Sequence, residues 1–382
     1  MKCGTADKLG TMLPEDRIRE VEAANKEASE RFNPMRIPRT LEEALGNRTV
    51  LVTGGTGSIG REIVSQVLRY KPRVVRVLSR NEYNQYAMRR ELGDRGDLRY
   101  LIGDVRDRDR LMRACEGVDV VFHASALKHV AICEYNPFEA VKTNVLGTQN
   151  LVEAALNYNM ELLVGISTDK AVSPTNTMGA TKLLAERMIL SASQYKGDRR
   201  TRFGVIRFGN VLASRGSAIP MFIEQIRQGG PVTITHPQMR RFFMSIPQAV
   251  ELALKASLSA RSGEIFILKM PVMRIIDLVN ALIRIYAPRF GHDPQAIGVN
   301  EIGLLPGEKL CEALMTPEEG LHATEFDDHF MVEPLSPPDP AKLKLENTGY
   351  DSESQELLDV DGIIELLEQR GLVEQFLTGM SS

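Results

Sequence analysis

Short apolar runs recur between residues 49 and 208, and segments with helical periodicity separate them. The runs are T-V-L-V-T from Thr49, R-V-V-R-V-L-S from Arg73, R-Y-L-I-G-D from Arg99, V-D-V-V-F-H-A-S from Val118, L-L-V-G-I-S-T from Leu162 and F-G-V-I-R-F from Phe203. Runs that are apolar at nearly every position are typical of strands buried on both faces of a sheet. Their alternation with helices predicts an α/β fold, a doubly wound parallel sheet with helices on both faces.

The pattern becomes irregular after Arg207, where loops such as Gly229-Gly230-Pro231 interrupt it. One further run, E-I-F-I-L-K from Glu264, predicts a strand that returns to the sheet. The expected organisation has four parts: an N-terminal helical extension (1–46), a nucleotide-binding domain (47–208, with 241–270 returning to it), a smaller interleaved substrate-binding lobe (209–240 and 271–350) and a C-terminal helical tail (351–382).

The two ends of the chain carry helical patterns of their own. In the segment from Pro14 to Phe32, Ile18 and Val21 predict a helix with one thin apolar stripe. A solvated arm and a docking or dimer-contact helix both fit this pattern. After the proline-rich loop near residue 334, a second helix is expected from about Asp359.

A glycine-rich loop, T-G-G-T-G-S-I-G, follows the first strand and precedes the helix from Arg61 to Tyr70. Glycines let the backbone approach a pyrophosphate, and the amides at a helix N-terminus point toward the anion. The strand before and the helix after supply the context that this Rossmann motif requires. The sequence therefore predicts a dinucleotide-binding loop with the contact residues Gly54, Thr56, Gly57, Ser58, Ile59 and Gly60.

The end of the second strand indicates which dinucleotide binds. Rossmann proteins that bind NAD usually place Asp or Glu there, whereas this chain has Ser79-Arg80-Asn81. An arginine beside a serine suits a 2′-phosphate, so NADP is favoured over NAD. Arg80 as a solvated residue and Glu82 in the acidic role remain alternatives, and Asp104-Val105 is expected near the adenine unless Asp104 only caps a helix.

Composition and charge exclude several classes of protein. The 382 residues are 43% hydrophobic and 25% charged, which is typical of a soluble globular protein. The 47 basic and 50 acidic residues give a net charge of -3 and no general attraction for nucleic acid. The four cysteines lack metal-ligand spacing and no run suits a membrane span, so we expect a cytoplasmic protein without a metal site and without membrane insertion.

Four candidate catalytic residues follow the fifth strand. Met178 and Lys182 are four positions apart and so share one face of a helix expected after Pro174. A thioether cannot exchange a proton. Proton transfer must therefore come from other groups, and Asp169 and Lys170 are the nearest in sequence.

These residues, the glycine loop and Asn144 in K-T-N-V-L-G-T resemble the extended short-chain dehydrogenase/reductase family, in which a tyrosine usually stands where this chain has Met178. Between about residues 47 and 335, longer strings resemble the bacterial nucleotide-sugar 4,6-dehydratases that act on UDP-N-acetylglucosamine in surface polysaccharide and glycan synthesis. The strings are H-A-S-A-L-K-H-V, E-Y-N-P-F-E-A-V-K-T-N, S-T-D-K-A, M-G-A-T-K, R-F-G-N-V-L, T-H-P-Q-M-R-R-F-F-M and L-P-G-E-K-L.

The resemblance implies a hydride transfer from carbon 4 to NADP, loss of the carbon 5 proton and of water from carbon 6, and return of the hydride to carbon 6. It implies Asp169 as the acid, Lys170 as the base, and Thr168, or else Ser167, as the hydrogen-bond donor to the oxygen on carbon 4. Lys182 would bind the nicotinamide ribose. Asp169, Lys170 or a water relay could take the proton of the carbon 4 hydroxyl, and the sequence does not choose among them.

Further contacts follow from the same resemblance. For the cofactor they are Ala124, Ser125, Ala126, Lys128 and Asn144, and for the UDP-sugar they are Lys128, His129, Thr168, Asn210, Arg241 and Glu308. Leu305 stands where the family pattern leads us to expect an arginine, which weakens a phosphate role for the Glu308 loop. A dimer or higher homo-oligomer is expected, because helices beside the sheet often form a dimer contact in this fold.

Two other functions remain open. A nucleotide-sugar epimerase or reductase of the same fold would use the same glycine loop and Lys182, but it would normally need the tyrosine that Met178 replaces. A non-catalytic NADP-binding protein would have no use for the Asp169-Lys170 pair.

Overall fold

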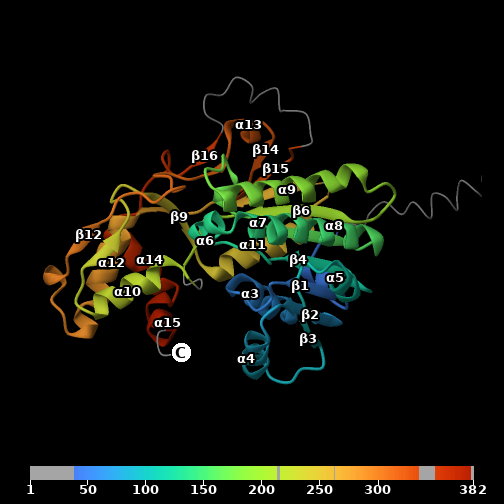
Figure 1. The fold of residues 1–382 in the computed structure, drawn as a ribbon, viewed down its shortest axis with the longest axis horizontal. Helices are drawn as coiled ribbons and strands as arrows, with labels where there is room; N and C mark the ends of the chain where they lie inside the picture. Colours follow the sequence, from blue (N-terminus) through green and yellow to red (C-terminus); the bar gives the residue numbers. More distant parts are fainter. Residues whose placement is uncertain (1–37, 213–215, 262, 335–348, 380–382) are drawn as a thin grey trace, which may run out of the picture. The chain divides into compact units, whose positions relative to one another are not determined.

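The structure is a computed structural model that describes residues 38–212, 216–261, 263–334 and 349–379. The helix expected between Pro14 and Phe32 lies outside these residues. The described part is built on a nine-stranded sheet (Figure 1). From edge to edge its strands are β14 (Ala323–Glu325), β15 (His329–Val332), β10 (Glu264–Leu268), β6 (Arg202–Arg207), β5 (Leu162–Ile166), β4 (Val120–His123), β1 (Thr49–Thr53), β2 (Val74–Ser79) and β3 (Leu98–Ile102).

Seven neighbouring strands of this sheet, from β10 to β3, are parallel. The six predicted strands are all present, and β10 returns to the sheet beside β6 as expected. The predicted α/β fold with a doubly wound parallel sheet is confirmed. The chain order reverses between β1 and β4, so the carboxyl ends of these two strands mark the point where such sheets bind ligands.

Two parts of the sheet differ from the expected domain boundaries. Strands β15 and β14 were assigned to the substrate lobe, but they extend the main sheet, and β15 runs antiparallel to β10 with Ile265 opposite Val332. Residues 241–270 were expected to return to the nucleotide-binding domain, and within them β10 joins the main sheet and α11 (Ile246–Ser259) packs on it. Strand β9 (Arg240–Met244) pairs instead with β11 (Val272–Arg274) and β7 (Asn210–Val211). Pairing partners far apart in sequence are chosen by tertiary contacts, which local patterns do not encode.

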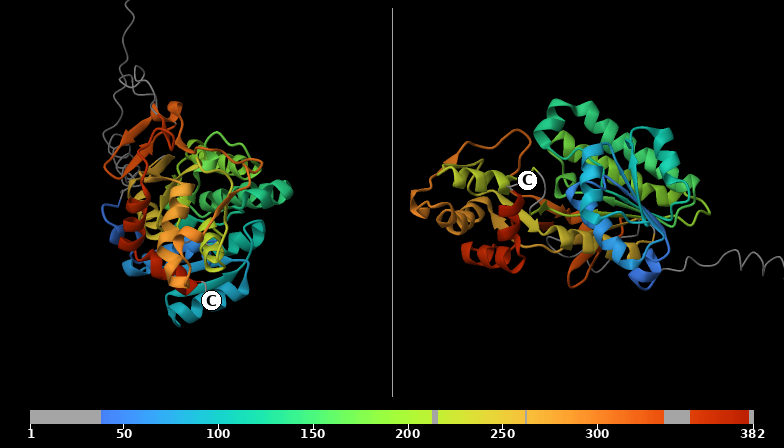
Figure 2. Two further views of the ribbon diagram at one scale, coloured as in Figure 1. Left: turned by 90° about the vertical axis from the view of Figure 1, so that its left-hand side faces the viewer. Right: turned by 90° about the horizontal axis from the view of Figure 1, so that it is seen from below.

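Helices cover both faces of the sheet (Figures 1 and 2). On one face α11 packs on α3, α2 and the strands β5, β6 and β10, and on the other α8 packs between α5 and α9. The helices of this part of the chain are α2 (Leu41–Leu45), α3 (Ser58–Val67), α4 (Glu82–Leu92), α5 (Arg108–Cys115), α6 (Val130–Tyr135), α7 (Pro137–Ala140), α8 (Gly147–Asn157), α9 (Thr177–Tyr195) and α11 (Ile246–Ser259), with the 3-10 turns η1 (Leu68–Tyr70) and η3 (Asp169–Ala171) and the π-helix η2 (Val141–Leu146).

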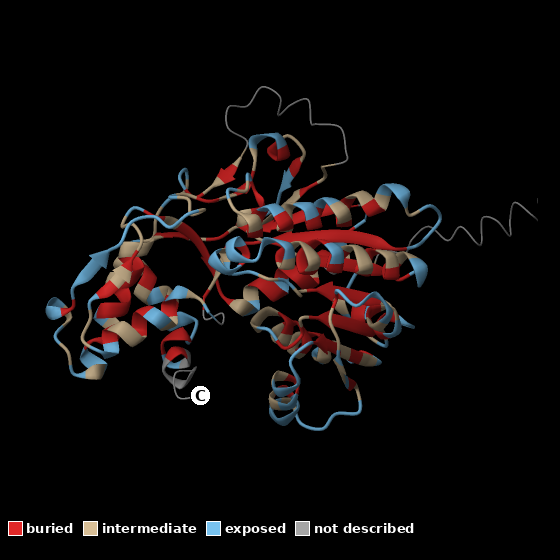
Figure 3. Cartoon of the chain, in the orientation of Figure 1, coloured by how far each residue is buried: buried red, intermediate tan, exposed pale blue. Residues whose placement is uncertain are grey.

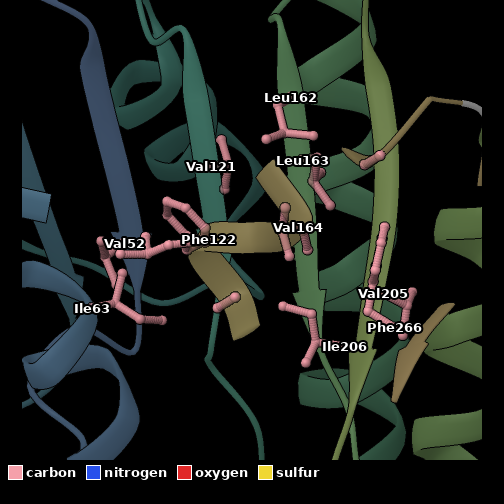
Figure 4. Close-up of a cluster of buried hydrophobic side chains, with 14 of the residues drawn as sticks. Val52, Ile63, Val121, Phe122, Leu162, Leu163, Val164, Val205, Ile206 and Phe266 are labelled. Atoms are coloured by element: carbon pink, nitrogen blue, oxygen red, sulfur yellow. The ribbon is translucent and has the colours of Figure 1, made fainter. Parts of the chain in front are cut away.

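The main core lies between the sheet and these helices. Val52, Phe122 and Val164 sit at the centre of adjacent strands, and all three are fully buried (Figure 4). The strands β1, β4, β6 and β10 are buried along their whole length, while the outer faces of the helices are exposed (Figure 3). Burial on both faces explains why the strands read as continuous apolar runs rather than as alternating ones.

A second apolar core lies in a smaller lobe, around Ile223, Leu282 and Leu367. The helix expected from about Asp359 is α14, and the Asp359 side chain caps it by accepting a hydrogen bond from the Gly362 amide at 2.8 Å. The remaining elements are α10 (Ala218–Arg227), α12 (Ile275–Tyr286), α13 (Pro317–Gly320), α14 (Val360–Gln369), α15 (Leu372–Gly379), β8 (Val232–Ile234), β12 (Val299–Glu301), β13 (Ala313–Met315), β16 (Tyr350–Asp351), η4 (Pro288–Phe290) and η5 (Pro294–Ala296).

Candidate active site

The glycine loop joins β1 to α3 at the switch point of the sheet. Gly54 has φ +65°, and a Cβ there would lie 2.8 Å from the Ala124 carbonyl carbon at the end of β4. A Cβ on Gly60 would lie 2.3 Å from the Gly54 carbonyl oxygen. Both positions therefore require glycine, because the loop runs against neighbouring backbone.

Gly57 has a different environment. It is the N-cap residue of α3 and gives the helix no side-chain cap, and a Cβ there would meet only the Gly54 oxygen, at 3.2 Å. The space beside this glycine is thus open at the start of the helix, where Ser58 and Ile59 form the first turn. Thr56, which precedes Gly57 in the chain, is buried. An open cradle at an uncapped helix N-terminus fits a pyrophosphate group.

Three predicted cofactor contacts lie at the end of β2. Ser79 and Asn81 use their side chains in hydrogen bonds within the protein, whereas Arg80 is exposed. Ser79 is buried, and its Oγ accepts a hydrogen bond from Gln85 Nε2 at 3.0 Å. Asn81 caps α4 by accepting from the Asn84 amide at 2.9 Å. The side chain of Arg80 is 54% exposed, and its Nη1 lies 3.9 Å from Asp104 Oδ2. Arg80 is thus available to an anion at this edge, although Asp104 shares part of its charge.

Asp104 and Val105 hold the loop that follows β3 in place through hydrogen bonds and packing. Asp104 accepts hydrogen bonds from the amide and guanidinium of Arg106, at 3.0 and 2.9 Å. Val105 is buried against Gly147, where a Cβ would lie 2.6 Å from the valine side chain, and its carbonyl accepts from Asn150 Nδ2 at 3.0 Å. Val105 therefore holds α8 close to the loop that follows β3.

His123, at the end of β4, is a functional-site residue that the sequence did not single out. Its Nδ1 lies 2.7 Å from Thr53 Oγ1 and its Nε2 3.0 Å from Thr148 Oγ1. The Thr148 hydroxyl donates to the Asn144 carbonyl at 2.6 Å, so it must accept from Nε2–H. Burial, together with the charge of Lys182, lowers the pKa of His123 to about 3. The histidine is thus a neutral link between β1 and α8.

Asn144 anchors the loop that follows β4. Its Oδ1 accepts from the Leu127 amide at 2.8 Å, and its Nδ2 donates to the Leu127 carbonyl and to Thr181 Oγ1, both at 3.0 Å. Asn144 lies in the π-helix η2, and such irregular turns are frequent at functional sites. The asparagine fixes this loop to α9, and the loop carries the predicted contact residues Ala124, Ser125, Ala126, Lys128 and His129.

Met178 and Lys182 lie in the first two turns of α9, as predicted. The methionine is buried in a small apolar cluster with Cys133 and Ala140, so its side chain fills space between α9 and the helices α6 and α7. Lys182 Nζ donates to the Ile166 carbonyl at 2.5 Å. Burial lowers the pKa of Lys182 to about 8.

The predicted acid and base lie together in η3, at the carboxyl end of β5. Asp169 is fully buried, and its Oδ1 accepts hydrogen bonds from Thr168 Oγ1 at 2.8 Å and from Lys170 Nζ at 3.0 Å. Lys170 Nζ also donates to Asn210 Oδ1 at 3.3 Å. The second oxygen of Asp169, Oδ2, is buried without a hydrogen-bond partner, as is Ser167 Oγ. A hydrogen-bonded carboxylate and amine at this strand end can exchange protons with a bound substrate.

Of the remaining predicted contacts, Arg241 lies in β9 and Glu308 lies in the loop between β12 and β13. Arg241 is buried, and its guanidinium donates to the Lys309 and Leu310 carbonyls at 2.7 and 3.1 Å, so backbone groups already occupy it. Glu308 accepts from the Leu305 amide at 3.0 Å and closes a turn.

Two further charged residues of the site, Lys309 and Glu312, were missed. Lys309 Nζ donates to the Val172 and Ser173 carbonyls at 3.0 and 2.7 Å. Glu312 is buried beside the Asp169 pair, whose charge acts on it. The signal that could have identified Glu312 is an acidic residue entering the apolar run A-L-M.

Within the described ranges, no group of three or more His, Cys, Asp or Glu side chains is placed to hold a metal ion. Among those same residues, no helix combines the length and the apolar character needed to cross a membrane.

The switch-point cradle, the lysine on α9 and the polar pair after β5 define a nucleotide-sugar-modifying enzyme of the extended short-chain dehydrogenase/reductase class. Residues 50–334 match the family model described as polysaccharide biosynthesis protein, and the chain belongs to this family. The predicted family is thereby confirmed.

Relatives within the family carry several names. The chain is 54% identical to a protein of Methanocaldococcus jannaschii named as an uncharacterized membrane protein, over 85% of this chain and 96% of that one. It is 40% identical to an inverting UDP-N-acetylglucosamine 4,6-dehydratase of Campylobacter jejuni and 40% identical to a UDP-glucose 4-epimerase of Rickettsia prowazekii, in each case over 75% of this chain and 83% of the relative. Among solved structures, Pen from Bacillus thuringiensis has a TM-score of 0.79 and 45% identity, covering 85% of this chain and 98% of that one.

Proposed function

We propose that the protein is an NADP-dependent nucleotide-sugar 4,6-dehydratase, a hydro-lyase that converts UDP-N-acetylglucosamine to a UDP-4-keto-6-deoxy-N-acetylhexosamine for surface polysaccharide or glycan synthesis. One observation carries the proposal. Asp169 and Lys170 form a hydrogen-bonded pair at the carboxyl end of β5, whereas position 178 holds a methionine buried among apolar groups. The site thus supplies an acid and a base for elimination but no tyrosine for simple oxidation and reduction.

Bound NADP would accept a hydride from carbon 4 of the sugar and return it to carbon 6, and Asp169, Lys170 or a water relay would take the proton of the carbon 4 hydroxyl. In this proposal Lys170 takes the proton from carbon 5, and Asp169 gives a proton to the hydroxyl leaving carbon 6. Thr168, whose hydroxyl already contacts Asp169, orients the oxygen on carbon 4, and Lys182 binds the nicotinamide ribose. Lys128, His129 and Asn210 would contact the sugar nucleotide, together with the loop that Arg241 and Glu308 hold in place.

The residues that follow β2 support NADP rather than NAD as the cofactor. The open cradle at Gly57 fits the pyrophosphate of either dinucleotide. Beyond β2, however, an exposed Arg80 stands beside a helix N-terminus capped by Asn81. A guanidinium near a helix N-terminus favours the extra phosphate of NADP.

A nucleotide-sugar epimerase is the second candidate, because the named epimerase relative is as similar as the named dehydratase. The buried Met178 argues against it, since epimerisation at carbon 4 needs a group that removes and returns the hydroxyl proton. Asp169 or Lys170 could take the carbon 4 hydroxyl proton in either reaction, but only the elimination of water needs an acid and a base together.

Incubation with UDP-N-acetylglucosamine and catalytic NADP distinguishes these functions when product mass is measured together with chromatographic separation of the epimers. The dehydratase gives a product lighter by one water without net NADPH. An epimer of unchanged mass would instead identify an epimerase, stoichiometric NADPH a dehydrogenase, and unreacted sugar a non-catalytic protein. A parallel incubation with UDP-glucose tests the choice of sugar.

We further propose a cytoplasmic homo-oligomer. Cys115, Cys133 and Cys311 are free thiols, which fits a reducing compartment. Helix α9, which packs beside α8, carries the apolar side chains of Leu184 and Tyr195, which are about half exposed. A pair of such helices from each of two copies would bury them, and sedimentation of the Leu184→Glu variant as a smaller species would support this contact.

A further inference from the structure

The loop between β12 and β13 is hydrogen-bonded to the segment between η3 and α9, which joins the predicted acid and base to the helix that carries Lys182. The Gly307 carbonyl accepts hydrogen bonds from Thr175 Oγ1 at 3.1 Å and from Asn176 Nδ2 at 3.0 Å. Gly307 has φ +82°, and a Cβ there would lie 2.9 Å from the Asn176 Cβ. The two segments therefore meet so closely that position 307 has no room for a side chain.

Lys309 forms a second connection between these segments. Its Nζ donates hydrogen bonds to the Val172 carbonyl at 3.0 Å and to the Ser173 carbonyl at 2.7 Å. Arg241, in β9, fixes the backbone of this lysine, because its Nη2 donates to the Lys309 carbonyl at 2.7 Å. A continuous series of hydrogen bonds thus runs from β9 through Lys309 to the residues that follow η3.

Val172 and Ser173 are the residues through which Lys309 can act on the acid and base. Val172 is the C-cap residue of η3, and its amide donates to the Asp169 carbonyl at 3.0 Å. Ser173 has φ +44°, a left-handed conformation that costs free energy in a residue other than glycine. Such a conformation persists where the surrounding contacts hold it. The hydrogen bond from Lys309 to the Ser173 carbonyl is one of these contacts.

The start of η3 is held by different elements. The Asp169 amide donates to the Phe208 carbonyl at 3.0 Å, next to the end of β6. The Lys170 carbonyl lies against α9, where a Cβ on Gly179 would meet its oxygen at 2.1 Å. Loss of the Lys309 hydrogen bonds would therefore release the end of the turn and leave its attachment to the main sheet in place.

We propose that Lys309 is a positioning residue for the elimination of water: by holding the Val172 and Ser173 carbonyls, it keeps η3 in the conformation in which Asp169 and Lys170 act on the bound sugar. This inference rests on the proposed dehydratase function. Lys309 neither touches the sugar nor exchanges a proton in this role. Its effect on the rate is indirect, because a displacement of about 1 Å at a reacting group can slow a reaction about 10²-fold.

The Lys309→Met variant removes the donor and keeps a side chain of similar length. We expect its kcat for water loss to fall about tenfold to a hundredfold, while the KM for UDP-N-acetylglucosamine and the binding of NADP stay within about threefold of wild type. Lys196→Met is the matched control and should keep the wild-type kcat, because Lys196 Nζ also donates to a backbone carbonyl, that of Thr201 at 2.8 Å, but at the C-terminal end of α9. A wild-type kcat in Lys309→Met, a loss confined to KM, or an equal loss in the control would overturn the proposal.

A second pair of variants tests the connection without a change of charge, since Lys309 Nζ also lies 4.0 Å from Glu312 Oε2. Gly307 and Gly303 lie in the same loop and both have φ +82°, but a Cβ on Gly307 would meet Asn176, whereas a Cβ on Gly303 would meet nothing within 4 Å. Alanine therefore has a similar backbone cost at both positions. Gly307→Ala should reproduce the loss of kcat, and Gly303→Ala should keep the wild-type value. Equal kcat in these two variants would contradict the proposal.

Combination with Lys170→Ala separates positioning from an independent role. A residue that acts through the acid and base should matter less once the base is gone, so Lys309→Met should lower kcat by a smaller factor in the Lys170→Ala protein than in wild type. The same factor in both backgrounds would show that Lys309 acts independently of Lys170.

Hydrogen exchange measures the conformation of η3 without turnover. The amides of Ala171 and Val172 donate hydrogen bonds within this turn, so they should exchange faster in Lys309→Met than in wild type or in Lys196→Met. Unchanged exchange would show that the lysine does not hold η3. A wild type that never releases water from the sugar would overturn the proposed function itself, while the exchange rates would still show whether Lys309 positions the turn.

Discussion

Two buried clusters of charged side chains lie at the two ends of the segment from Glu312 to Glu319, and they are built in opposite ways. At one end Arg207 donates hydrogen bonds to both oxygens of Glu186, to both oxygens of Glu319 and to the Leu314 carbonyl, at 2.7–3.1 Å. All five of its N–H donors are thus used. At the other end, Asp169 and Glu312 each retain a buried oxygen without a partner.

The two glutamates of this segment respond accordingly. Burial alone would raise the pKa of Glu319, but the charge and hydrogen bonds of Arg207 hold it below the usual range. Burial and Asp169 hold the pKa of Glu312 above that range. A cluster whose hydrogen bonds are all formed stabilises the junction of β6, α9 and α13, whereas a buried carboxyl group with a raised pKa and an oxygen without a partner, such as Glu312, is typical of a site that exchanges protons.

The largest effect is expected from Lys170→Ala. Loss of the proposed base should reduce water elimination about 10³-fold or more while NADP binding stays near wild type, and it should also lower the free energy of unfolding, because the buried Asp169 loses one of its two hydrogen-bond donors. The measurements are product mass over time, cofactor titration and chemical denaturation. Lys255→Ala, on the surface of α11, should retain full activity as the control. Turnover at the wild-type rate in Lys170→Ala would remove Lys170 from the mechanism.

The opposite behaviour is expected at the satisfied cluster. Arg207→Met should lower the free energy of unfolding by about 3–5 kcal/mol, because it leaves two buried carboxylates without a counterion. Denaturant unfolding measures this loss. A triple variant with Arg207→Met, Glu186→Leu and Glu319→Leu should be more stable than Arg207→Met alone, since no buried charge remains. Equal stability of the single and triple variants would show that lost packing, rather than charge, causes the effect.

The two glutamates should respond to pH with opposite sign. Glu319 has a lowered pKa, so the stability it adds is complete above the ordinary carboxyl pKa of about 4.3 and is lost as the pH falls through its lower folded value. Glu319→Gln should therefore cost about 1–3 kcal/mol at neutral pH and less in acid.

Glu312 has a raised pKa, so wild-type stability falls as the pH rises from about 4.3 through its higher folded value. The stability of Glu312→Gln should not show that fall, so the variant should become more stable relative to the wild type as the pH increases. Thermal unfolding of both variants between acid and neutral pH gives the two slopes. Slopes of the same sign would contradict the contrast between the clusters.

The smallest effect is expected at Met178. Because its side chain only fills an apolar cluster, Met178→Leu should cost less than about 1.5 kcal/mol of stability and leave kcat within about threefold. Met178→Tyr tests the other limit. A large gain in kcat would show that a missing proton acceptor at this position limits the reaction, whereas unchanged turnover would assign proton transfer to the Asp169 cluster.

Much of the fold follows from local pattern. Strands buried on both faces leave continuous apolar runs, so β1 to β6 and β10 could be located from sequence. The glycine loop could also be identified from the sequence, because Gly54 and Gly60 lie so close to neighbouring backbone that only glycine fits there. The adjacent residues Asp169 and Lys170 could be placed at a strand end, where parallel sheets bind ligands.

What was missed depends on contacts between distant segments. The short strands β14 and β15 carry too few residues for a periodic signal, and their place in the sheet follows from pairing with β10. Arg207 and Glu319 meet although they are 112 positions apart. The local sequence around each residue does not show which residue will pair with it, because the partner of a buried charge is set by the fold and not by the neighbouring residues.

The sequence by itself determined the doubly wound sheet, the dinucleotide loop and the pair that follows β5, because strand periodicity, glycine conformation and adjacency along the chain are local properties. Only the tertiary structure decided which buried carboxyl groups have hydrogen-bond partners for both oxygens and which do not. That distinction depends on where Glu312 and Glu319 come to rest, one beside Asp169 and the other beside Arg207. Burial sets the energetic cost of a charge, and the partners that meet it there determine whether it stabilises the fold or remains available for chemistry.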